Sequence, residues 1–106
     1  MAIRLSKRAV ADLQEIRAYT IDNWGREQWL IYYRRIVAAF ERIAAKPEIG
    51  KDRSLFASGM RSIDCEKHII FYRQLKATGG KPVVLHIVHQ SRNLPALIYY
   101  EHLDLA

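Results

Sequence analysis

Two helical stretches separated by a single glycine constrain the fold of this chain more than any other feature. Apolar residues recur at steps of three and four within residues 10–21 and again within residues 30–44, which is the pattern of one buried face of an amphipathic helix. Ser6 is placed to cap the first helix, and Pro47 cannot continue the second. Gly25 lies between the two stretches and suits the backbone that ends a helix. Helices joined by so short a turn are expected to pack antiparallel as a hairpin.

The rest of the chain has the pattern of β-strands. A short alternating segment at residues 2–5 is a candidate N-terminal strand, and residues 47–53 have the composition of a loop. Three further strands are predicted where β-branched and aromatic residues are dense, at residues 59–65, 68–75 and 83–89. Two glycines between the last two strands indicate a hairpin turn. The sequence therefore predicts an α+β fold: a short N-terminal strand, an antiparallel helical hairpin on one face, then a three-stranded antiparallel sheet.

Three expectations about the core follow from these patterns. Phe71 and Tyr72 are neighbours on a strand and should face opposite sides of the sheet, with one beneath the helices and the other facing out. Trp24, at the tip of the helical hairpin, is expected to close the edge of the core. Asp12 is expected on the polar side of the first helix.

Length, charge and cysteine content limit the class of protein. The 106 residues fit a single domain spanning residues 1–106, with residues 93–106 as a C-terminal tail. A net charge of +6 favours acidic partners, but no run of Lys or Arg indicates sequence-specific DNA binding by this chain alone. No stretch reaches the roughly 20 apolar residues of a membrane span. Cys65 is the only cysteine, so a reducing cytoplasm is the expected location.

No motif for a metal, a cofactor or a nucleophile stands out. His86 and His89 are three residues apart on a predicted strand, where strict alternation would point them to opposite faces. Cys65 could be paired with His68 or His86 as a nucleophile, but a lone cysteine is more often an inert buried or edge residue, and we expect that here. We therefore predict no cofactor and no metal site.

Metal-free RNA cleavage is the one chemical alternative. It needs Arg, His and Tyr side chains that move protons and stabilise a phosphate. The sequence offers Arg61, His89, Arg92, Tyr99 and Tyr100. The same residues can equally be solvated strand positions and tyrosines that cover the core, and the sequence leaves both interpretations open.

Four motifs in order resemble the ParE toxins, which belong to the RelE/ParE superfamily. They are the tryptophan–glycine turn at residues 24–28 (WGREQ), the proline-to-glycine loop at residues 47–51 (PEIGK), the strand pair GMR at 59–61 with HIIFYR at 68–73, and the last strand VHQSR at 88–92. The resemblance runs from about Leu5 to Arg92.

That resemblance implies a toxin of a type II toxin–antitoxin pair, of the kind that stabilises plasmids. Members inhibit DNA gyrase by binding, use no cofactor, and are neutralised by a ParD-type antitoxin with an acidic, flexible C-terminal part. They share a fold with the RelE ribonucleases but lack the catalytic set of those enzymes, so no catalytic residue is expected here. The candidate target-binding residues are Arg61, His89, Arg92, Tyr99 and Tyr100. The candidate antitoxin-binding residues are Trp24, Arg34, Arg35 and Arg73.

Two other functions remain open from the sequence. One is a ribosome-dependent mRNA endonuclease of the RelE type, for which Arg61, His89, Arg92 and Tyr99 would have to converge. The other is an inactive homologue that only binds antitoxin. The tail 93–106 is more apolar than the resemblance implies, and it could be structural or could contact the target.

Overall fold

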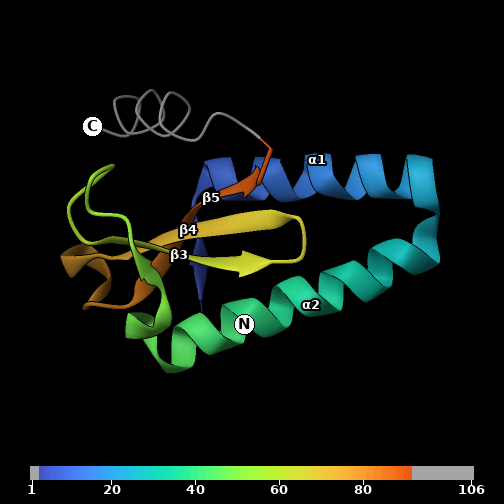
Figure 1. Ribbon diagram of the computed structural model, residues 1–106. Helices are drawn as coiled ribbons and strands as arrows, with labels where there is room; N and C mark the ends of the chain where they lie inside the picture. The colour runs from blue at the N-terminus through green and yellow to red at the C-terminus, as the bar shows by residue number, and fades with distance from the viewer. Residues whose placement is uncertain (1–2, 92–106) are drawn as a thin grey trace.

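The computed structural model describes residues 3–91. In chain order, the elements are β1 (Arg4–Leu5), α1 (Lys7–Trp24), α2 (Arg26–Ala45), the short 3-10 helix η1 (Pro47–Ile49), β2 (Lys51–Asp52), β3 (Met60–Cys65), β4 (His68–Gln74), the 3-10 helix η2 (Lys76–Thr78) and β5 (Pro82–His89). Figure 1 shows α1 and α2 joined at one end as a hairpin, with the strands gathered beside them. The α+β class and the helical hairpin are as predicted.

Local capping explains where the helices begin and end. The Ser6 hydroxyl accepts a hydrogen bond from the Ala9 N–H at 3.0 Å and donates one to the Leu85 carbonyl at 2.8 Å. It thus caps α1 and also joins its first turn to β5. Gly25, at a φ of 90°, separates α1 from α2, and α2 ends one residue before Lys46 and Pro47. Each of these boundaries confirms the sequence prediction.

The sheet has five strands where three were predicted, because the expected N-terminal strand joins it and a further short strand, β2, forms. Its order is β1-β5-β4-β3-β2. The three central strands are antiparallel, and Gly79 and Gly80 in the β4–β5 connection both have positive φ. β1 pairs in parallel with β5, and the short β2, in a segment predicted to be loop, pairs with β3. The result is a five-stranded mixed sheet, because two-residue strands at both edges add to the predicted hairpins.

Both faces of this sheet are covered. On one face the helices pack against Ile70 and Tyr72 of β4. On the other, Phe56 and Ala57 from the β2–β3 loop pack against Phe71, and the Phe56 and Phe71 rings meet edge to face with centroids 6.2 Å apart. Phe71 and Tyr72 do face opposite sides, but the expectation that one faces out is wrong: their exposed fractions are 0% and 1%.

The tryptophan expected at the core edge is exposed instead. Trp24 is 69% exposed, whereas Trp29, one turn into α2, is 7% exposed and joins the main core. Figure 1 shows that the hairpin tip extends beyond the ends of the strands. A residue at the tip therefore has no sheet to pack against. Trp29 of α2 packs into the core instead.

Candidate binding site

Arg61, a predicted target contact, is engaged by the loop that follows α2. Its Nη1 donates to the Gly50 carbonyl at 3.0 Å and lies 3.5 Å from the Glu48 carbonyl. The side chain is half-buried on β3. Arg61 thus holds the proline-to-glycine loop against the sheet, and the structure assigns it a local structural role.

Tyr72 also holds this loop, through two hydrogen bonds of its hydroxyl. Its hydroxyl donates to the Pro47 carbonyl at 2.5 Å and accepts from the Gly50 N–H at 2.9 Å. Burial raises the pKa of this phenol, so it stays protonated and can serve as donor and acceptor at once. A Cβ at Gly50 would lie 2.8 Å from Tyr72 Cε1, 2.9 Å from Arg61 Cβ, and closer still to the Tyr72 oxygen. Close packing, rather than a special φ, requires glycine at this position.

His89 lies at the other end of the sheet. Arg61 pairs with Tyr72 of β4, and His89 pairs with His68 of the same strand. Because these β4 residues are four apart, Arg61 and His89 are separated by roughly 13 Å along the strands. The Nδ1 of His89 accepts from the Ser91 N–H at 3.1 Å. The structure therefore does not bring Arg61 and His89 into one patch. The other predicted target contacts, Arg92, Tyr99 and Tyr100, lie outside the described residues, as does the tail 93–106.

Tyr32, Cys65 and His89 lie around His68. Its imidazole meets the His89 ring edge to face, with centroids 5.3 Å apart, and its Nδ1 contacts the Tyr32 hydroxyl of α2. Burial, with a smaller contribution from His89, lowers the pKa of His68 to about 4. Cys65 is buried, and burial raises the pKa of its thiol, which fits an unreactive side chain.

The predicted antitoxin contacts lie on three different elements. Trp24 ends α1, Arg34 is exposed on α2, and Arg73 is a half-buried residue of β4. Arg35 already forms an ion pair with Glu66 at 2.8 Å. The side chains of Arg35 and Glu66 are both largely exposed, so this ion pair contributes at most about 1 kcal/mol to the stability of the fold.

A buried carboxylate, missed from the sequence, joins α1 to β5. Asp12 was expected on the polar face but is 7% exposed. Its Oδ2 accepts from the Ile87 N–H at 2.9 Å and contacts the His86 imidazole. A register shift leaves Leu85 unpaired between Val84 and His86, whereas the pairing with β4 is continuous from His86 to His89. Burying this carboxylate is tolerable because donors surround it.

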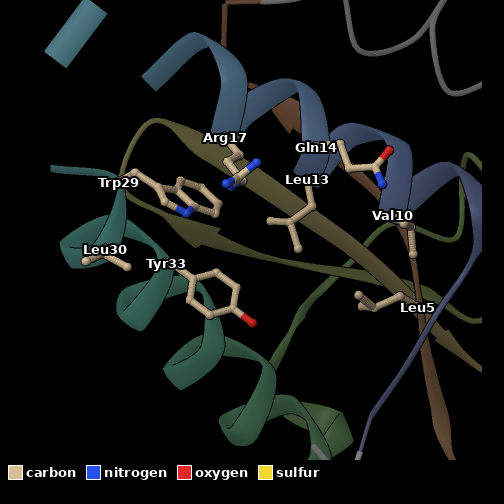
Figure 2. A pocket seen from close by; sticks show the side chains of 8 residues that line it. All are labelled: Leu5, Val10, Leu13, Gln14, Arg17, Trp29, Leu30 and Tyr33. Carbon is tan, nitrogen blue, oxygen red and sulfur yellow. The ribbon is translucent and has the colours of Figure 1, made fainter. Parts of the chain in front are cut away.

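A groove of about 360 Å³ lies between the two helices. We call it the interhelical groove and define it by its lining residues, which are Leu5, Val10, Leu13, Gln14, Arg17, Trp29, Leu30 and Tyr33. Figure 2 shows the side chains of α1 and α2 facing each other across it, with Leu5 at one end. Val10 and Leu30 are 41% and 42% exposed, although apolar residues of their size are usually buried.

This geometry suits the docking of an amphipathic helix. Elongated apolar grooves between helices bind such helices through side chains at helical spacing. The sequence contains only a weak indication of this groove. Val10, Leu13 and Arg17 are spaced at i, i+3 and i+7 on one face of α1, but the apolar members were assigned to the core.

Within residues 3–91, no group of three or more His, Cys, Asp or Glu side chains is arranged to hold a metal ion. No helix in this part of the chain is long and apolar enough to cross a membrane.

Comparison with known proteins identifies the family. The model of the ParE toxin of type II toxin–antitoxin systems (parDE) matches residues 3–94. A toxin ParE1 of Caulobacter vibrioides is 37% identical over 93 residues, covering 88% of this chain and 93% of the relative. A toxin ParE1 of Mycobacterium tuberculosis is 38% identical over 87 residues, covering 81% and 86%. A solved chain described as the chromosomal ParDE toxin–antitoxin system of P. aeruginosa superimposes with a TM-score of 0.69 at 22% identity, covering 84% of this chain and 95% of that one, which shows the shared fold. The chain therefore belongs to the ParE toxin family of type II toxin–antitoxin systems.

Proposed function

We propose that this toxin acts in the cytoplasm by binding DNA gyrase, without catalysis or cofactor, and that a ParD-like antitoxin neutralises it. The observation that carries the proposal is the family match over residues 3–94. The contacts of Arg61 favour action by binding over RNA cleavage. Its guanidinium is hydrogen-bonded to the Gly50 carbonyl, and it lies far along the strands from His89. A ribonuclease would need such groups to converge on one phosphate.

We further propose the interhelical groove as the antitoxin site. It offers an apolar surface on two rigid helices, and a net charge of +6 favours an acidic partner. Trp24 remains a candidate contact, because it follows Arg17 by seven residues, or about two helical turns, on the same side of α1. Arg34, Arg35 and Arg73 lie outside the lining residues and stay predictions.

Induced expression in cells tests the mode of action. The proposal predicts a prompt DNA damage response while messages stay intact. Rapid loss of translation with cleaved messages would instead identify a ribosome-dependent endonuclease, and unchanged growth would identify an inactive homologue. A variant without residues 95–106, which lie outside the described residues, is expected to lose toxicity while still binding an acidic helix.

A further inference from the structure

Arg17 is the one charged side chain among the eight that line the interhelical groove. Gln14 and Tyr33 add neutral polar groups, and the remaining five are apolar. Figure 2 shows Arg17 extending from α1 into the space between the helices, toward Trp29. Among residues 3–91, no carboxylate forms an ion pair with it. The groove therefore presents an unneutralised cation at the edge of an apolar surface.

A partner that fills the groove must satisfy the charge and the hydrogen-bond donors of this guanidinium. Covering a guanidinium with apolar groups removes its water and leaves its donors unsatisfied, which is strongly unfavourable. A lysine or arginine on the partner would add repulsion between like charges. A carboxylate, in contrast, matches the planar fork of the guanidinium with two parallel hydrogen bonds. Of these three possibilities, only an Asp or Glu turns the cation into a favourable contact.

The spacing on α1 fixes where that carboxylate should lie. Val10 and Arg17 are seven residues apart on one side of the helix, which corresponds to about 10.5 Å along its axis. A helix lying along the groove has the same rise per residue. Its apolar anchor over Val10 and its carboxylate over Arg17 should therefore also be about two turns apart.

We propose that Arg17 is a specificity-determining residue of the groove. It admits an amphipathic helix that carries Asp or Glu two turns from an apolar anchor, and it rejects one with an amide or a cation at that position. This inference rests on the proposed function in one respect only, the assignment of the groove as the antitoxin site.

A displayed library of 16-residue amphipathic helices, randomised at the polar positions, is the probe. The purified full chain should enrich helices with Asp or Glu at one position, two turns from an apolar residue. Selection with Arg17→Glu should switch that position to Lys or Arg. Arg42→Glu makes the same change in charge at an exposed residue of α2 outside the lining residues, and should leave the preference for an acid unchanged.

The best-enriched peptide then gives a quantitative test. Replacing its key Glu with Gln should weaken binding to the wild-type chain about tenfold, the size expected for a partly exposed charge-assisted hydrogen bond. The same replacement should change binding to Arg17→Gln by less than about twofold. An equal loss in both proteins, or a switch produced by Arg42→Glu, would overturn the role of Arg17.

The outcomes also separate the two proposals. If selected helices bind equally well to Leu30→Glu, which alters the groove wall, then the groove is not the docking site and both the Arg17 inference and the antitoxin assignment fail. If they bind in the groove without any preference for an acid, only the Arg17 inference fails. Neither outcome depends on whether the toxin inhibits gyrase.

Discussion

Replacing Gly50 with alanine should destabilise the protein through one specific collision. At its φ of −71° and ψ of 151° alanine is sterically allowed, and the backbone effect alone would stabilise the chain by about 0.4–1 kcal/mol. The added Cβ, however, would lie 2.8 Å from Tyr72 Cε1 and 2.9 Å from Arg61 Cβ. Tyr72 is 1% exposed and cannot move aside freely.

The magnitude follows from what the collision displaces. Overpacking a filled core costs about 1–3 kcal/mol, and shifting the phenol weakens its bonds to Pro47 and Gly50, each worth about 0.5–1.5 kcal/mol. After subtraction of the backbone effect, Gly50→Ala should lower the free energy of unfolding by about 2–4 kcal/mol. Urea denaturation followed by circular dichroism measures this value.

A double-mutant cycle identifies the partner. Tyr72→Phe removes the hydroxyl and should cost about 1–3 kcal/mol alone, but the double variant should be less destabilised than the sum by at least about 1 kcal/mol. Gly79→Ala is the control. Nothing lies within 4 Å of its added Cβ, so only its positive φ matters, and its effect should add to that of Tyr72→Phe. A Gly50→Ala protein as stable as wild type, or strict additivity with Tyr72→Phe, would show that the Cβ does not collide with Tyr72.

Three further predictions test other parts of the account. Leu30→Glu should weaken binding of the selected acidic helix more than tenfold, whereas Ile31→Glu should not; both residues are 42% exposed, but only Leu30 lines the groove. His68 titrates at about 4 in the fold against 6.5 when unfolded, so the unfolded chain binds more protons between these values and stability should fall as pH drops from 6.5 toward 4; denaturation at several pH values should show a shallower fall for His68→Gln. Phe71→Ala should lower the unfolding free energy by about 3–5 kcal/mol, and a well-folded variant within 1 kcal/mol of wild type by urea denaturation would show that the second face of the sheet contributes little.

Features set by local chemistry could be predicted from the sequence. Ser6 caps a helix wherever its hydroxyl can reach a free amide, and Pro47 ends one because it lacks an N–H. The glycines at 79 and 80 permit a tight connection between two strands. Each of these predictions depends on residues a few positions apart, and each is confirmed.

Features set by distant contacts could not. β1 pairs with β5 across nearly the whole described chain, and a two-residue strand carries too little pattern to predict that pairing. The second face of the sheet is buried only because the β2–β3 loop folds back over Phe71. Trp24 and Trp29 look alike in a helical pattern, and their burial differs because one lies beyond the end of the sheet.

The candidate site shows the same division. Arg61 is a good choice from the sequence for a cation that contacts a target, but its guanidinium is bonded to the main-chain carbonyl of Gly50. The groove is lined by residues of β1, α1 and α2, and periodicity does not encode how these elements pack together. The proposed role of Arg17 depends on both helices, because residues of α2 line the groove opposite α1.

A supercoiling assay with purified gyrase and purified toxin shows whether the proposed binding to gyrase occurs. If the toxin binds gyrase, it should block supercoiling, and cleaved plasmid DNA should accumulate with gyrase bound to it. Premixing the toxin with its antitoxin should restore supercoiling. Unimpaired supercoiling at a toxin concentration that arrests growth, together with cleavage of ribosome-bound messages, would contradict the account.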